Sequence, residues 1–154
     1  MNTAAYIESG ALRKALQKAP DTTKKGIHSM LERSGIQTQG IMKTKVKTGV
    51  SGELKKSIKY FFTDYMTVAI EPTAKHAAPH EHGSKPHWVS VKEGSPLNMW
   101  AKSKGINPYA LQRSIAKKGT KAHPFLQRTL NEVDSQVLPD FNKGIGKIIE
   151  RILE

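Results

Sequence analysis

Histidine is the residue type with the clearest potential for chemistry in this chain. Five of the six histidines lie in one stretch, at His76, His80, His82, His87 and His123. In an extended segment, His80 and His82 would present both rings on one face of a strand, beside Glu81. Such a group suits a zinc ion or the metal of a nuclease.

The spacing of these histidines does not match an established metal signature. The H-E-x-x-H pattern is absent, because His80-Glu81 is followed by His82, Gly83 and Ser84. Two interpretations follow, a metal site built from His80, His82 and His123 or a polar loop rich in histidine. We expect the second, with no metal ligand and no cofactor.

Other reactive groups are scarce. Between residues 54 and 130 the only carboxylates are Asp64, Glu71, Glu81 and Glu93, without a spacing typical of a divalent-cation site. The chain contains no Cys, no G-x-S-x-G nucleophile motif and no G-x-x-x-x-G-K-[ST] phosphate loop. A Ser/His/Asp site stays open, because its members need not be near one another in sequence. We expect no enzyme and no catalytic residue.

Charge is the strongest compositional feature. The 154 residues hold 25 Lys and Arg against 13 Asp and Glu, a net charge of +12 with neutral His. Residues 83–128 contain nine bases (Lys85, Lys92, Lys102, Lys104, Arg113, Lys117, Lys118, Lys121 and Arg128) and one acid, Glu93. A field of this sign attracts polyanions such as nucleic acid, and it also keeps a surface soluble.

The length and the apolar pattern favour one domain that does not enter a membrane. About 100–200 residues form a typical domain, so we expect a single one over 1–154. Apolar runs are only a few residues long, which predicts no transmembrane helix. The first residues lack the basic and apolar regions of a secretory signal, so we expect a cytoplasmic location during synthesis.

The first half of the chain predicts helices followed by a small sheet. Residues 11–18 and 21–41 have helical spacing, with Asp21 as the expected cap of the second helix. Strands are predicted at 57–62 and 65–71, joined by a turn at Thr63-Asp64. Residues 77–83 are predicted to add a short third strand, interrupted or edged at Pro79.

The second half predicts three further helices. Ser95-Pro96 and Asn107-Pro108 each open a short helix, and Gly105 and Gly119 end them. From Pro124 the steps between apolar residues are 4, 3, 4, 4, 4, 3 and 4, one continuous helical stripe. The stripe consists of Leu126, Leu130, Val133, Val137, Phe141, Ile145, Ile148 and Ile152. It keeps its phase across Pro139, which predicts a kinked helix and not two separate ones.

These elements predict an α+β fold. A small antiparallel sheet, made of a hairpin and a short third strand, is expected to pack against N-terminal helices and a long C-terminal helix. Its regions are 1–42 (N-terminal helices), 43–83 (β-hairpin region), 84–123 (loop with two short helices) and 124–154 (amphipathic helix, kinked near Pro139).

Three ordered sequence blocks carry a resemblance to a known family. They consist of Thr48, Gly49, Leu54, Ser57 and Ile58, then Ala77, Glu81 and Gly83, then Gly119, Thr120, Pro124, Phe125 and Leu126. Their order between N-terminal and C-terminal helices resembles the tail-completion or neck proteins (head–tail connector, minor tail) of long-tailed bacteriophages and prophages. The chain departs from the family pattern by extra residues between Gly49 and Leu54 and by Pro79-His80 in the second block.

The resemblance implies a structural virion protein of a siphophage or prophage. Such a protein forms part of an oligomeric ring at the head–tail junction, with genome DNA passing through it. The implied partners are copies of itself, in a ring that forms either before or only on assembly, and neighbouring connector, tail-terminator or tail-tube proteins. The implied location is the virion, at the head–tail junction or tail end, after assembly in the host cytoplasm.

Non-specific contact with DNA is the expected role of the basic residues in this setting. The DNA-facing candidates are Lys43, Lys45, Lys47, Lys55, Lys56, Lys117, Lys118 and Lys121. Two alternatives to the virion role stay open, a basic nucleic-acid-binding protein that is not viral and a metal nuclease that depends on histidine.

Overall fold

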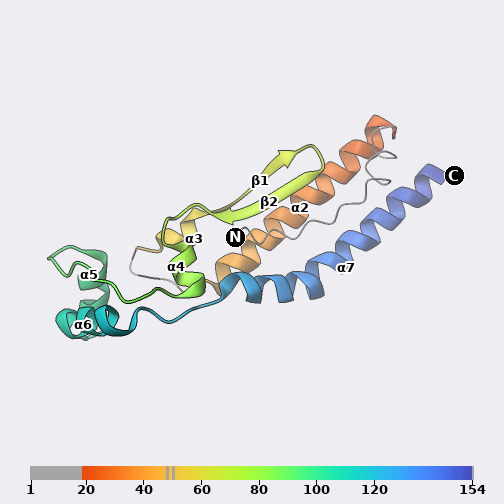
Figure 1. Cartoon of the computed structure of the whole chain (residues 1–154). Coiled ribbons are helices and arrows are strands. Elements are labelled where there is room, and N and C mark those ends of the chain that lie inside the picture. The colour runs from red at the N-terminus through yellow and green to blue at the C-terminus, as the bar shows by residue number, and fades with distance from the viewer. Residues whose placement is uncertain (1–18, 48, 50, 154) are drawn as a thin grey trace.

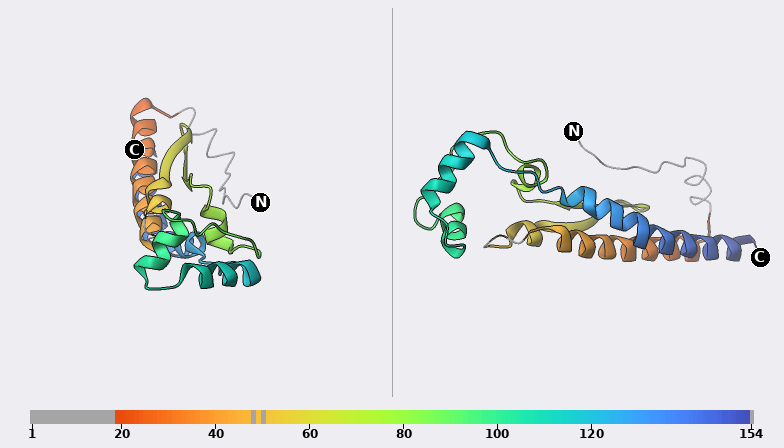
Figure 2. Two further views of the ribbon diagram at one scale, coloured as in Figure 1. Left: turned by 90° about the vertical axis from the view of Figure 1, so that its left-hand side faces the viewer. Right: turned by 90° about the horizontal axis from the view of Figure 1, so that it is seen from below.

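The computed structural model describes residues 19–47, 49 and 51–153, and its long axis is formed by two helices. Helix α2 (Asp21–Lys45) and helix α7 (Phe125–Leu153) lie side by side and run in opposite directions (Figures 1 and 2). The helix expected at 11–18 and the motif residue Thr48 lie outside the described residues. Helix α2 extends beyond the predicted 21–41 to Lys45. Asp21 is its first helical residue and not its cap, which is Pro20.

A β-hairpin packs on helix α2. Strands β1 (Ile58–Asp64) and β2 (Thr67–Pro72) are antiparallel, with Tyr60 opposite Ile70. A Cβ at Gly35 of α2 would stand 3.0 Å from Val68 of β2, so the bare glycine allows the hairpin to approach the helix closely. The α+β fold is therefore confirmed.

The turn of the hairpin differs from the prediction by two residues. It lies at Tyr65-Met66, because Asp64 pairs with Thr67 across the two strands. The Asp64 carboxylate accepts hydrogen bonds from the Met66 backbone N–H at 2.7 Å and from the Thr67 hydroxyl at 3.1 Å. A short carboxylate that bonds the backbone two residues onward is a standard way to stabilise a turn.

The predicted third strand is wrong, since these residues form helix α4 (Ala77–His82). Pro79 is the third residue of α4, where the missing N–H would have no partner within the helix. Ala77 and Glu81, four residues apart, are both buried on one side of the helix. The sequence analysis also missed the short helix α3 (Glu53–Ser57), which leads directly into β1.

The main apolar cluster lies where these short elements meet the ends of the two long helices. It consists of Met42, Val46, Leu54, Ile58, Ala77 and Phe125. Ile58 is completely buried and Phe125 is 1% exposed. Burying aliphatic and aromatic side chains of this size contributes about 1.5–3 kcal/mol each. This cluster therefore joins α2, α3, β1, α4 and α7 into one body.

The two helices predicted around residues 95–119 are confirmed, and they project from the body. Helix α5 (Pro96–Ser103) is capped by Ser95 and helix α6 (Pro108–Lys118) by Asn107, whose side chain accepts from the Tyr109 N–H at 2.9 Å. The two helices contact each other beyond the end of the α2–α7 pair (Figures 1 and 2). We call residues 85–118 the arm.

The arm is held together by its own polar contacts. The Asn98 amide donates to the Val91 carbonyl at 2.9 Å, and the Gln112 amide donates to the Val89 carbonyl at 2.6 Å. Trp88 is not part of the core, because it is 73% exposed.

Helix α7 continues through Pro139 as one element, and its axis changes direction part-way along (Figure 1). The prediction that the apolar stripe is the buried side of α7 is partly wrong in the first turns of the helix. Phe125 and Thr129 are each 1% exposed, whereas Leu130 is 45% exposed and Val137 is 3% exposed. The first turns therefore bury a face rotated away from Leu130. Among the described residues, no helix is both long and apolar enough to cross a membrane.

The burial of α7 predicts unequal costs for two substitutions in the stripe. Val137→Ala removes two buried methyl groups, so it should lower the free energy of unfolding by about 2 kcal/mol. Leu130→Ala on the exposed side should change it by less than about 0.5 kcal/mol. Urea unfolding of both variants followed by circular dichroism checks this, and equal costs would contradict the observed orientation of the helix.

Candidate functional site at the base of the arm

Both chain segments that lead into the arm meet at one short backbone pairing, which we call the junction. Ser84 and Thr120 exchange two backbone N–H···O=C hydrogen bonds, each of 3.2 Å, in an isolated antiparallel bridge. Their hydroxyl oxygens are also 2.9 Å apart and share a hydrogen bond. The junction therefore closes the arm as a loop at its base.

Each residue of this bridge is preceded by a glycine that the pairing requires. Gly83 has φ 76° and ψ 177°, and Gly119 has φ 71° and ψ −159°. This backbone region is essentially restricted to glycine. A Cβ at Gly83 would stand 2.5 Å from the Thr120 carbonyl oxygen, and a Cβ at Gly119 would overlap the Ser84 carbonyl. The two segments can approach this closely only because neither residue has a side chain.

Glu81 connects the junction to the start of helix α7. Its carboxylate is 7% exposed and accepts a hydrogen bond from the Leu126 backbone N–H at 2.9 Å. The first N–H groups of a helix have no partner within the helix, and the helix dipole favours a negative charge there. Glu81 therefore acts as an end cap for α7, supplied by a residue 45 positions earlier in the chain.

Several of the motif residues that the structure describes pack in the apolar core or form hydrogen bonds within the protein. Leu54, Ile58 and Phe125 belong to the main apolar cluster, and Leu126 packs against it. The Ser57 hydroxyl donates to the Leu54 carbonyl at 2.8 Å at the end of α3. Gly49 and Pro124 are exposed. Blocks that are far apart in sequence therefore converge on one side of the body.

Two of the three histidines named as metal candidates come together. The ring centroids of His80 and His123 are 5.4 Å apart, and the His80 ring meets Phe125 edge-on at 5.6 Å. The His123 backbone N–H also donates to the His80 carbonyl at 2.9 Å. His82 is exposed on the same short helix. Among the residues that the structure describes, no three His, Cys, Asp or Glu form a group that could hold a metal ion.

The surroundings of these two rings disfavour the protonated state. Burial lowers the pKa of His80 below its usual value of 6.5, and positive charge on His123, His76 and Lys47 lowers it further, against a smaller opposing effect of Glu81. Burial and the charges of Lys47, Arg128 and Lys121 lower the pKa of His123 in the same way. Burial and the nearby positive charges thus both favour the neutral form of each ring.

Six of the eight DNA-facing candidates form two exposed groups, and Lys43 and Lys45 lie apart from them. Lys117, Lys118 and Lys121 are exposed at the end of α6 and just beyond it, while Lys47, Lys55 and Lys56 are exposed around α3. Lys45 forms an ion pair with Glu132 of α7, and Lys43 is half-buried. Lys45 therefore serves a contact within the chain.

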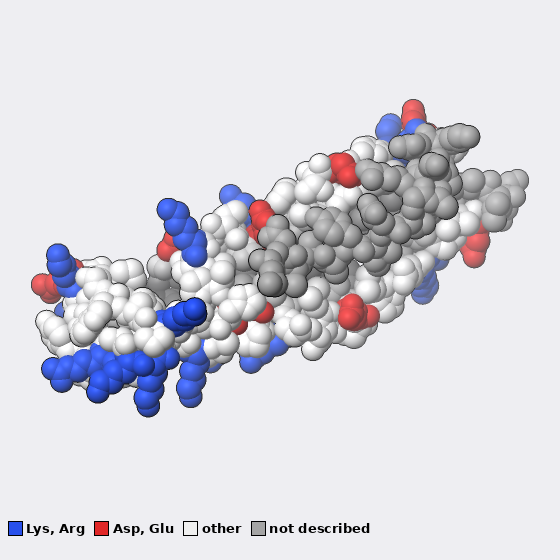
Figure 3. Space-filling view, in the orientation of Figure 1, with Lys and Arg blue, Asp and Glu red and all other residues white. Residues whose placement is uncertain are grey.

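Positive charge dominates the arm and the segment that follows it. Residues 94–131 contain seven bases (Lys102, Lys104, Arg113, Lys117, Lys118, Lys121 and Arg128) and no acid. Lysine and arginine side chains gather along the lower edge of the α5–α6 end of the molecule (Figure 3). Exposed apolar side chains lie in the same arm, with Tyr109 at 63%, Ile106 at 41% and Met99 at 41% exposure.

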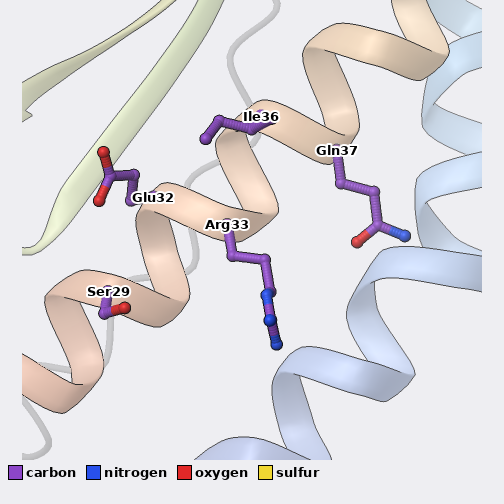
Figure 4. Close-up of a pocket in the computed structure, with 5 residues that line it drawn as sticks. All are labelled: Ser29, Glu32, Arg33, Ile36 and Gln37. Carbon is purple, nitrogen blue, oxygen red and sulfur yellow. The ribbon is translucent and has the colours of Figure 1, made fainter.

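A hollow in the surface, of about 540 Å³, lies along helix α2. Its lining side chains, Ser29, Glu32, Arg33, Ile36 and Gln37, all come from that helix, and Glu32 and Arg33 point in different directions (Figure 4). Such an arrangement is typical of a helix surface and does not bring reactive groups together. The base of the arm is therefore the better candidate site.

Comparison of the chain with protein-family models, with curated proteins and with solved structures gives no match.

Sequence reasoning missed two residues that build this site. Ser84 supplies half of the junction, and its only sequence signal is its place directly after Gly83, mirrored by Thr120 after Gly119. Thr129 is buried in α7, where its hydroxyl donates to the Phe125 carbonyl at 2.8 Å. The repeated Gly-Ser/Thr pair could have suggested the pairing of the two segments.

Two glycines at the ends of α5 and α6 offer a matched test of the junction. Gly105 has φ 66° with open space around its Cβ position, so Gly105→Ala should cost only about 1–2 kcal/mol of backbone strain. Gly119→Ala adds a collision with the Ser84 carbonyl and should cost at least about 3 kcal/mol. Thermal unfolding of both variants measures the difference, and similar losses would argue against close approach at the junction.

The lowered pKa values of the two rings predict that acid destabilises the fold. Because the unfolded chain binds protons at His80 and His123 more readily than the folded chain, stability should be present above the ordinary pKa of 6.5 and fall as pH drops below it. Urea midpoints at about pH 7.5 and about pH 5 measure this loss. His80→Gln should reduce it, whereas His87→Gln in the exposed loop should leave it unchanged.

Proposed function

We propose that this chain is a structural virion protein of a long-tailed bacteriophage or prophage. It forms part of a homo-oligomeric ring at the head–tail junction, as a tail-completion or neck protein, and performs no catalytic step. Connector, tail-terminator or tail-tube proteins are its neighbours, and genome DNA passes through the ring. The chain is assembled in the host cytoplasm and then resides in the virion.

The observation that carries this proposal is the convergence of the motif residues on the base of the arm. Glu81 and Gly83 of the second block meet Gly119, Thr120 and Leu126 of the third. Their contacts are backbone pairings, a helix cap and close packing, which orient one part of the molecule relative to another. This is the function expected of residues that define the shape of an assembly subunit.

The shape of the chain supports the same proposal. An arm that projects from an elongated body is suited to reach a neighbouring subunit, and heterologous contacts of this kind generate closed rings. Met99, Ile106 and Tyr109 remain exposed on that arm, and exposed apolar groups near one another are typical of surfaces that bind other proteins.

Sequence-independent binding of nucleic acid, outside any virion, is the second candidate. The seven bases without an acid at residues 94–131 favour it, since such a surface neutralises phosphates regardless of sequence. In the ring, the same bases and Lys47, Lys55 and Lys56 would face the DNA passage.

Deletion of the gene from the phage or prophage that encodes it tests the proposal. We expect electron micrographs of lysates to show full heads and separate tails that fail to join, because the subunit that links them is missing. Supplying the wild-type chain from a plasmid should restore complete particles, and the Gly119→Ala variant should restore fewer. Normal particles without the gene, together with tight and salt-sensitive DNA binding by the purified monomer, would favour the second candidate.

A further inference from the structure

A cleft of about 260 Å³ lies between the arm and the body, separate from the basic surface of the arm. Trp100 of α5 lines it from the arm. His76 and His80 line it from the start and interior of α4, and His123 from the segment before α7. The cleft is thus built from segments that the junction holds together.

Basic groups dominate the lining of this cleft. Lys47, just after α2, and Lys55 of α3 join the three histidines. Lys47 is close enough to both His80 and His123 to act on the charge state of each ring. Five side chains that carry or accept a positive charge therefore face one small volume, and they come from separate parts of the chain.

One polar atom in this cluster lacks a partner. The Nδ1 atom of His80 is buried and makes no hydrogen bond with the part of the chain that the structure describes. A buried polar atom without a partner is destabilising, so it is usually matched by a ligand or by water. Imidazole nitrogens, ammonium groups and an indole N–H are together suited to donate hydrogen bonds to oxygen atoms of an anion.

The size of the cleft narrows the class of ligand. Sites for cofactors and drug-sized molecules usually have volumes of about 300–1,000 Å³. At about 260 Å³ the cleft fits a small anion better than a whole nucleotide. Glu53 is the single acid among the lining residues, and its carboxylate would repel such an anion. The net positive charge of the remaining groups outweighs this one carboxylate.

We infer that the cleft between Trp100, the α4 histidines and Lys47 binds a phosphate group and thereby fastens the arm to the body. The phosphate is either a free ion or part of a nucleic-acid backbone, because both present the same oxygen atoms. Binding does not require a ring, since every lining residue belongs to one chain. The virion proposal can therefore fail while the phosphate site stands. The phosphate site can likewise fail while the virion proposal stands.

The test is a titration of the purified chain at low salt, followed through the imidazole signals of the histidines by NMR. Inorganic phosphate and a short DNA duplex are added in separate titrations, with sodium chloride at matched ionic strength as the blank. Lys47→Gln should weaken binding about fivefold, and Glu53→Gln should strengthen it by a similar factor, because the two substitutions change the cleft charge in opposite directions. Lys25→Gln removes the same charge as Lys47→Gln at an exposed position of α2 outside the cleft and serves as the matched control.

A site for the free ion is supported if inorganic phosphate binds, with lower affinity for Lys47→Gln and higher affinity for Glu53→Gln than for the wild-type chain. Binding of the duplex alone, with the same order of affinities, supports a site for backbone phosphate. If Lys25→Gln weakens binding as much as Lys47→Gln does, the effect comes from general charge and the inference is wrong. Absence of any change at the His76, His80 and His123 signals with both ligands would also overturn it.

Discussion

The close backbone approach at the junction is the constraint on which the rest of the structure depends. Ser84 and Thr120 can pair only because Gly83 and Gly119 adopt a conformation that other residues avoid and present no side chain to the opposite strand. This pairing brings the two ends of the arm together. It also places Glu81 where its carboxylate caps helix α7. One short contact thus orients the arm, α4 and the longest helix relative to one another.

The stability of that region comes mainly from the adjacent apolar cluster. Ile58 and Phe125 are almost completely buried, whereas the bridge itself contributes a few exposed hydrogen bonds, each worth about 0.5–1.5 kcal/mol. The cluster therefore holds the elements together, and the junction decides the direction in which the arm leaves them. The basic surface of the arm and the cleft beneath Trp100 are consequences of that direction, since their residues come from segments that only this arrangement brings together.

The sequence predicted elements well where local chemistry is decisive and poorly where it is not. Ser95-Pro96 and Asn107-Pro108 mark helix starts because their side chains cap the helix within three residues, and both helices are present. The sequence predicts a short strand at residues 77–83, interrupted or edged at Pro79, where the structure has helix α4. Ala77 and Glu81 are buried on one side of that helix. Spacing alone places Leu130 in the buried stripe, yet the first turns of α7 bury Phe125 and Thr129 instead. Phe125 belongs to the apolar cluster that joins α7 to α2 and α4.

By itself, the sequence determined the α+β composition, the hairpin, the three later helices and the excess of positive charge, since each of these depends on nearby residues or on composition. Only the tertiary structure decided which distant residues meet: Glu81 with Leu126, Ser84 with Thr120, His80 with His123, and Lys45 with Glu132. The physical reason is that these contacts form between segments tens of residues apart. Their geometry follows from the packing of whole helices, which no local pattern encodes.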